Sequence, residues 1–194
     1  PLLLKGNDLI GQSKTGSGKT TAFSLPILQK TDLLDRRVQA LILCPTRELC
    51  TQVAREIRKL GRRHPGLQVL ILSGGQPMYP QLCALEKGVH IVVGTPGRVL
   101  DHINRRKLDL LAVKTVVLDE SDRMLDMGFQ EDMEKILNEI PKPRQMVFFS
   151  ATFPRSIEAM SRRYQQNAVR VTIEDEKKQT QADIRQMVYE IAPE

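Results

Sequence analysis

The octapeptide Ser13-Lys14-Thr15-Gly16-Ser17-Gly18-Lys19-Thr20 lies between a short apolar run, Leu9-Ile10, and a segment with helical character that starts at Thr21. A strand, a glycine-rich turn and a helix N-terminus form a phosphate cradle, because consecutive backbone N–H groups converge on one anion and the helix dipole adds partial positive charge. Glycines at 16 and 18 let the backbone approach phosphate oxygens without an intervening Cβ. We therefore expect residues 13–20 to bind a nucleotide, with Lys19 on the outer phosphates and Thr20 on Mg²⁺.

One position departs from the usual phosphate-loop pattern, which has Gly where this chain has Ser13, five residues before Gly18. The alternative interpretation is a glycine-rich turn that arose by chance. The placement of Gly-Lys-Thr at the point where a strand passes into a helix argues against chance.

The composition limits the size of the molecule and the kind of partner. A chain of 194 residues is long enough for one well-buried domain and short for two. The formal net charge of +6 suggests an anionic partner, although solubility alone would look similar. Aromatic residues are scarce, with no Trp, three Tyr and five Phe. If the partner is a nucleic acid, this scarcity disfavours binding by base stacking and favours backbone contacts.

The cysteines and the hydropathy indicate a reducing, aqueous environment. The three cysteines form no CxxC pair, and we expect them to be reduced, in the cytoplasm or another reducing intracellular compartment. No apolar run approaches membrane-spanning length, so we expect no membrane partner. The chain begins at Pro1 rather than Met, and we expect it to be a fragment.

Short apolar runs alternate with amphipathic segments along the chain. Near-continuous apolar character is typical of strands buried on both faces, whereas residues 169–173 alternate and predict an edge strand. Apolar stripes at helical spacing predict helices that pack on the sheet. The pattern favours a three-layer α/β sandwich around a mainly parallel sheet, over residues 1–173. The expected buried strands are 8–10, 40–44, 68–72, 90–93, 115–118 and 145–149, and the stripes lie within 49–60, 133–140 and 157–164.

The character of the chain changes after Ile173. Residues 174–181 are polar and charged and predict a linker. Residues 184–191 alternate like a strand, with little chain left to pair with it. We interpret 174–194 as a linker followed by the first strand of a further domain.

Nearly every polar or glycine-rich motif directly follows a predicted strand. In a parallel sheet these points lie on one rim, where open α/β folds bind ligands. Any one of the motifs could be an ordinary turn, but chance explains all of them together poorly. The motifs are Pro45-Thr46-Arg47, Gly74-Gly75, Thr95-Pro96-Gly97-Arg98, Asp119-Glu120-Ser121-Asp122 and Ser150-Ala151-Thr152.

Asp119 and Glu120 complete the predicted nucleotide site. An acid at the end of a buried strand can hold Mg²⁺ opposite Lys19 and Thr20, and a second acid can polarise the attacking water. The alternative is an exposed Asp-Glu pair that caps the next helix. The four-residue apolar run before Asp119 favours the metal interpretation.

A second set of motifs predicts contacts to further phosphates. Thr95 followed by Pro96 is a helix-start signal, and a helix N-terminus with a nearby Arg suits an anion. Two such starts, at Thr46-Arg47 and Thr95-Arg98, together with the glycine pair at 74 and 75 could follow a phosphodiester chain without reading bases. The alternative is that they are only good helix caps. The basic clusters at 62–63, 105–107 and 162–163 are expected to be solvated faces, and the three histidines receive no catalytic or metal role.

In this order and spacing, SKTGSGKT, PTREL, GG, TPGR, DESD and SAT resemble the N-terminal RecA-like domain of DEAD-box RNA helicases, especially DbpA-like bacterial members. The resemblance implies a RecA-like P-loop NTPase fold, with ATP and Mg²⁺ as cofactors, the RNA backbone as partner, and a second RecA-like domain. It implies catalytic roles for Lys19, Asp119 and Glu120, with Thr20 and Asp119 on the metal. It places RNA on Pro45, Thr46, Arg47, Gly74, Gly75, Thr95, Gly97 and Arg98, and coupling of hydrolysis to strand separation on Asp122, Ser150 and Thr152.

Two departures from the family pattern are mild: Ser121 replaces Ala in the name-giving tetrapeptide, and Ser13 replaces another Ala. The upstream glutamine motif is expected before Pro1. Two rival functions remain open at this point. One is another P-loop NTPase or a small-molecule kinase, and the other is a non-catalytic RNA-binding scaffold. The implied function is an ATP-dependent RNA helicase motor whose isolated first domain is nearly inactive.

Overall fold

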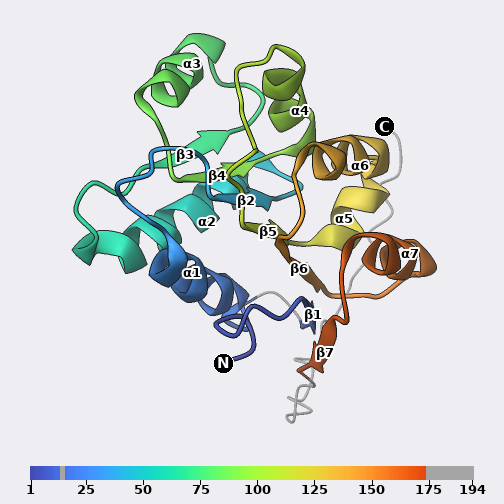
Figure 1. Cartoon of the computed structure of the whole chain (residues 1–194). Helices are drawn as coiled ribbons and strands as arrows, with labels where there is room; N and C mark the ends of the chain where they lie inside the picture. The colour runs from blue at the N-terminus through green and yellow to red at the C-terminus, as the bar shows by residue number, and fades with distance from the viewer. Residues whose placement is uncertain (14–15, 174–194) are drawn as a thin grey trace, which may run out of the picture.

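The computed structural model describes residues 1–13 and 16–173. They form one seven-stranded parallel sheet in the order β3-β4-β2-β5-β6-β1-β7, flanked by helices on both faces (Figure 1). The three-layer α/β prediction is confirmed. The strands are β1 Leu9–Gln12, β2 Ala40–Leu43, β3 Val69–Leu72, β4 Ile91–Gly94, β5 Thr115–Leu118, β6 Gln145–Ser150 and β7 Val169–Thr172.

The helices connect successive strands, as parallel pairing requires. They are α1 Lys19–Lys30, α2 Arg47–Leu60, α3 Met78–Lys87, α4 Pro96–Asn104, α5 Ser121–Asp126, α6 Gln130–Glu139 and α7 Arg155–Tyr164, with a 3₁₀ turn, η1, at Gly61–Arg63. The predicted linker and strand at 174–194 lie outside the described residues. No helix in the described part of the chain is long and apolar enough to cross a bilayer.

Two apolar cores lie on the two faces of the sheet, because successive strand residues point to opposite sides. In β2, Ile42 packs on the face covered by α1 and α2, whereas Leu41 and Leu43 pack on the face covered by α4 to α7 (Figure 1). The predicted helical stripes are part of these cores: Val53 and Ile57 belong to the first, and residues 133–140 and 157–164 contribute to the second. As predicted, β7 is an edge strand, half-buried on alternate residues.

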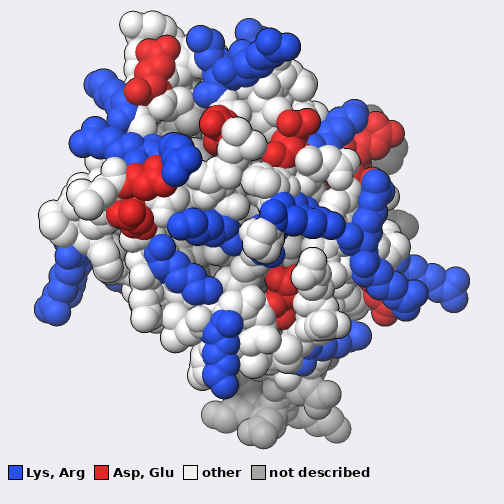
Figure 2. All heavy atoms as spheres, viewed as in Figure 1, with Lys and Arg blue, Asp and Glu red and all other residues white. Residues whose placement is uncertain are grey.

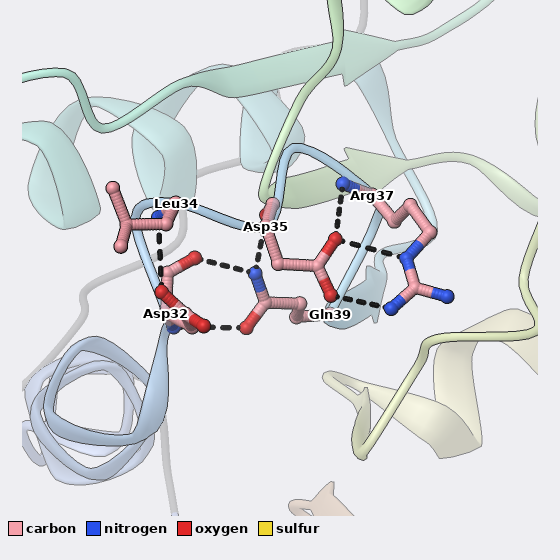
Figure 3. A network of polar contacts seen from close by, with 5 residues as sticks. All are labelled: Asp32, Leu34, Asp35, Arg37 and Gln39. Atoms are coloured by element: carbon pink, nitrogen blue, oxygen red, sulfur yellow. Dashed lines mark hydrogen bonds and ion pairs between the residues drawn. The ribbon is translucent and has the colours of Figure 1, made fainter.

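The loop between α1 and β2 is held by the buried side chain of Gln39 (Figure 3). Its Nε2 donates to the carbonyls of Asp32 and Asp35, both at 2.7 Å, and its Oε1 accepts from the Asp32 N–H at 2.9 Å. Asp35 also pairs with Arg37, whose hydrogen bonds hold the pKa of that carboxyl down at about 2. This network lies at the amino end of β2, away from the motif-bearing rim.

Gly94, the last residue of β4, lets the following loop pass close to β3. A Cβ at this position would lie 2.7 Å from the Leu72 carbonyl oxygen and 2.4 Å from Cγ2 of Val99. We expect Gly94→Ala to lower the free energy of unfolding by about 1–3 kcal/mol, as overpacking does. Urea denaturation measures the effect. Gly74→Ala is the control, because a Cβ there meets no atom within 4 Å, and an equal loss in both variants would contradict the steric explanation.

Candidate nucleotide site and second phosphate-binding rim

The motif-bearing loops lie side by side at the carboxyl ends of the strands. Backbone hydrogen bonds continue past the strand ends and join these loops: the Ser13 N–H donates to the Ser150 carbonyl at 3.1 Å, the Asp119 N–H to Leu43 at 2.9 Å, and the Thr95 N–H to Leu72 at 2.9 Å. The single rim expected from the sequence is therefore present in the fold.

The strand order divides this rim into two halves. The loops after β3, β4 and β2 are neighbours, and they carry the glycine pair, the Thr95 helix start and the Thr46 helix start. The loops after β5, β6 and β1 are neighbours in turn, and they carry Asp119-Glu120, Ser150-Ala151-Thr152 and the phosphate loop. Motifs scattered along the chain thus gather into two adjacent groups.

The described part of the phosphate loop has the backbone of an anion cradle. Gly16 and Gly18 have φ angles of 84° and 83°, a conformation that residues with a side chain rarely adopt. The Lys19 ammonium donates to the Ser13 carbonyl at 2.9 Å. The buried Ser13 hydroxyl accepts from Ser17 at 2.9 Å, so serine at this position braces the loop. Lys14 and Thr15, predicted members of the cradle, lie outside the described residues.

Asp119 ends β5 as a buried carboxylate, 3% exposed. Burial raises its pKa to about 6, against the attraction of the Lys19 ammonium, which lowers the pKa. Its Oδ1 accepts a hydrogen bond of 3.1 Å from the N–H of Glu120. The interpretation of this pair as an exposed helix cap is wrong for Asp119, because the side chain faces the interior beside Lys19.

Glu120 has a left-handed backbone, with φ 51° and ψ 50°. A non-glycine residue in this region is strained, and such strain concentrates at functional sites. Glu120 occupies the N-cap position of α5 but makes no side-chain capping bond. Its carboxylate instead pairs with the Arg123 guanidinium at 3.3 Å.

The remaining residues of the β5 and β6 loops join these two segments. Asp122 accepts from the Thr152 N–H at 2.9 Å and from its hydroxyl at 2.8 Å. Burial acts to raise the pKa of Asp122, but these bonds outweigh it and the pKa lies below its usual range. The Ser121 hydroxyl is buried and donates to the Phe149 carbonyl at 3.1 Å, so the replacement of Ala is accommodated by a bond to β6. The buried Ser150 hydroxyl lies near the Asp122 carboxylate and contributes to the lowering of its pKa.

The second half of the rim carries the other predicted residues. Thr46 caps α2 by accepting from the Leu49 N–H at 3.2 Å, whereas Thr95 has the N-cap position of α4 without a side-chain bond. Gly75 has a φ of 72°, and a Cβ there would lie 3.1 Å from Nη1 of Arg47. Arg98 Nη1 donates to the Gln76 carbonyl at 3.1 Å, which joins α4 to the glycine loop. Gly74 and Gly97 are exposed, whereas Pro45 is buried.

On the face seen in Figure 2, the cationic side chains are spread out with acidic ones among them, rather than gathered in one patch. Arg62, Arg63 and the basic residues 105–107 are exposed, as expected for solvated faces. Two of the three histidines make hydrogen bonds within the fold. His90 is buried, and its Nδ1 accepts from the Gln68 N–H at 2.9 Å. His102 Nε2 lies 2.8 Å from Oε1 of Gln81, a residue that belongs to none of the motifs identified in the sequence.

Asp119 gives the site a measurable cost in stability. In the absence of metal the folded-state pKa of about 6, against an ordinary value of 3.8, means that unfolding becomes easier as pH rises toward 6, with the full penalty above that pH. We expect Asp119→Asn to raise the free energy of unfolding at pH 7.5 by about 2–3 kcal/mol, because about two pKa units correspond to that energy. The gain should shrink at pH 5.

Urea denaturation in a chelator at both pH values tests this prediction. Asp126→Asn, a change at an exposed carboxyl of α5, is the matched control and should leave stability nearly unchanged at either pH. A destabilised Asp119→Asn variant would contradict the assignment of a desolvated carboxylate to this position.

Comparison with known proteins defines the class that this fold and rim represent. The family model described as "DEAD/DEAH box helicase" matches residues 1–160. The chain belongs to this family.

Particular relatives share much of the sequence. The chain is 46% identical over 191 residues to a protein named DEAD-box ATP-dependent RNA helicase CshA from Bacillus cereus, covering 98% of this chain and 36% of that protein. It is 53% identical over 165 residues to ATP-dependent RNA helicase CshA of Listeria monocytogenes, covering 84% and 31%. The crystal structure of a DEAD box protein from Methanococcus jannaschii is similar, with a TM-score of 0.86 and 44% identity, over 90% of this chain and 47% of that one. The chain thus spans about a third of the length of these two bacterial relatives.

Proposed function

We propose that the chain is the first motor domain of an ATP-dependent RNA helicase, in which ATP binding and hydrolysis remodel RNA duplexes. The observation that carries this proposal is the division of the rim: the nucleotide-type loops adjoin a second set of loops suited to phosphates. A metabolite kinase would leave that second set without a purpose. The greater lengths of the relatives support a longer protein that contains this chain and a second RecA-like domain, which we call the parent protein.

The nucleotide half suits ATP with Mg²⁺. The cradle around Gly16 and Gly18 would hold the phosphates on backbone N–H groups, and Lys19 would leave the Ser13 carbonyl for the outer phosphates. The buried Asp119 and the Thr20 hydroxyl would hold Mg²⁺, which neutralises phosphate charge when bound. The described residues contain no cluster of three His, Cys, Asp or Glu side chains. Phosphate and water oxygens would therefore complete the shell, as is usual for Mg²⁺.

The residues beside the cradle would carry the chemistry and its coupling. Glu120 would accept the proton of the attacking water once its ion pair with Arg123 opens. The bonds between Asp122 and Thr152 join the segment that contains Glu120 to the end of β6, so a shift at one is transmitted to the other. Ser150 lies on the same side of this junction, since its hydroxyl helps to lower the pKa of Asp122, and it would take part in the same coupling.

The other half of the rim would bind the RNA backbone. Arg47 and Arg98 would pair with phosphates, and Gly74, Gly75 and Gly97 allow close approach of the chain. Thr46 and Thr95 stand at helix starts, whose N–H groups suit a phosphate. The buried Pro45 would contribute through its backbone. Contacts of this kind read no sequence, so binding should depend on salt more than on base composition.

An ATPase assay of the parent protein tests the proposal. We expect hydrolysis to be stimulated by single-stranded RNAs of unrelated sequence, with weakening of RNA binding as salt rises. Metabolites containing hydroxyl groups should neither stimulate hydrolysis nor receive phosphate. Phosphoryl transfer to such a metabolite would replace this proposal with the kinase, and RNA binding without any ATP hydrolysis would replace it with the scaffold.

A further inference from the structure

Helix α3 buries a single residue, and that residue is polar. Gln81 is 5% exposed, whereas the other residues of α3 are half-buried or exposed. A buried amide is costly unless its hydrogen bonds are made. The partners of Gln81 therefore reveal why the helix carries a glutamine here.

The amide of Gln81 joins three segments of the rim. Its Nε2 donates to the carbonyl of Ser73 at 3.4 Å, at the start of the glycine loop. Its Oε1 accepts from Arg98 Nη1 at 3.1 Å and from His102 Nε2 at 2.8 Å, both on α4. The orientation of the amide follows from chemistry, since a guanidinium only donates and a carbonyl only accepts.

His102 completes the arrangement beneath the surface. The ring is fully buried, and burial, with a contribution from the Arg98 charge, lowers its pKa. The ring is therefore neutral at pH 7, and because Gln81 Oε1 only accepts, the proton lies on Nε2. This tautomer leaves Nδ1 unprotonated, and Nδ1 has no partner among the described residues.

Arg98 is thereby fixed on one edge. Its Nη1 is occupied by Gln81 Oε1 and by the Gln76 carbonyl, both at 3.1 Å. Nε and Nη2 of Arg98 have no hydrogen-bond partner among the described residues, and a guanidinium held on one side can present a defined pair of donors to a phosphate. An unrestrained arginine would lose more side-chain entropy on binding.

We propose that Gln81, supported by His102, is a positioning residue for RNA binding: it orients the Arg98 guanidinium and fixes the spacing between the glycine loop and the start of α4. This inference rests on the proposed function, because it assumes that this half of the rim binds an RNA backbone. Gln81 acts through Arg98 and contacts no nucleotide itself.

Gln81→Met in the parent protein tests the proposal, because methionine keeps the length of the side chain and removes both polar groups. We expect the RNA concentration for half-maximal ATPase stimulation to rise about tenfold, the effect of losing one hydrogen bond to a charged group. The affinity for a non-hydrolysable ATP analogue should not change. Gln39→Leu is the control: it removes a similarly buried glutamine, at the opposite end of β2, and should leave the RNA requirement unchanged.

A double-mutant cycle with Arg98→Ala separates positioning from a general structural role. If Gln81 acts through Arg98, Gln81→Met should add nothing in the Arg98→Ala background. Additive losses, or a Gln81→Met variant that binds RNA normally while Arg98→Ala binds weakly, would overturn the inference alone. Normal RNA binding by Arg98→Ala would instead count against the proposed RNA-binding rim. Should Gln81→Met show no cooperative melting, the cycle is run with His102→Phe, which removes only the donor to Gln81 and should weaken RNA binding in the same direction.

Discussion

Replacing Glu120 with glutamine is expected to lower the RNA-stimulated kcat for ATP hydrolysis by about 10²–10⁴, the usual range for loss of a general base. The amide has nearly the same shape but cannot take a proton from water. Nucleotide affinity should stay within a few fold, because in the proposed site the cradle, Lys19 and Asp119 would hold the nucleotide and its metal without Glu120. Single-turnover hydrolysis and binding of a fluorescent nucleotide, both in the parent protein, measure the two quantities.

Glu131→Gln is the matched control for this prediction. Its carboxylate lies on α6 with the side chain 86% exposed and pairs only loosely with Lys135, at 3.5 Å. Such a surface pair contributes little, so kcat should not change. An unchanged kcat in Glu120→Gln itself would remove Glu120 from the chemistry and would mean that another group activates the attacking water.

The strands of the fold were predictable because apolar character concentrates in them. Apolar runs such as 115–118 and 145–149 predict strands that are buried on both faces, and each is a strand in the structure. The order of the strands was not predictable, since pairing joins segments distant in the chain: β1 lies between β6 and β7. The grouping of the motifs into two halves of the rim depends on that order, so it could not be predicted from the sequence.

The site shows the same division between local and distant information. Glycines at 16 and 18 indicate a turn with left-handed backbone angles, because glycine adopts positive φ readily, and both have positive φ in the structure. Glu120 has a left-handed backbone as well, yet nothing in its side chain requires it. The burial of Gln81 could not be predicted either, because a glutamine is ordinarily a surface residue. Its partners Ser73 and Arg98 come from other segments of the chain. Its one local signal is its position on α3, where an apolar residue would be usual.

The rate of ATP hydrolysis by the isolated chain is expected to be far below that of the parent protein. We expect residues 1–194 alone to hydrolyse ATP at least about 10³-fold more slowly than the parent protein with saturating RNA, because an arginine that meets transition-state charge is worth 10³–10⁵ in this class of reaction. In the proposed two-domain arrangement that arginine belongs to the other RecA-like domain. Within the described residues, Arg123 pairs with the Glu120 carboxylate and is therefore already engaged.

The rate of the isolated chain, measured with and without RNA beside the rate of the parent protein, decides this prediction. Binding of an ATP analogue to the isolated chain is the control, since it shows that the cradle is folded and that the loss lies in chemistry. Adding the remaining domain as a separate polypeptide should restore part of the rate, limited by its concentration because the linkage between the domains is absent. Full RNA-stimulated hydrolysis by the isolated chain would mean that Lys19 and the bound metal suffice for the transition state. The two-domain active site would then be wrong, while the Glu120 prediction would stand.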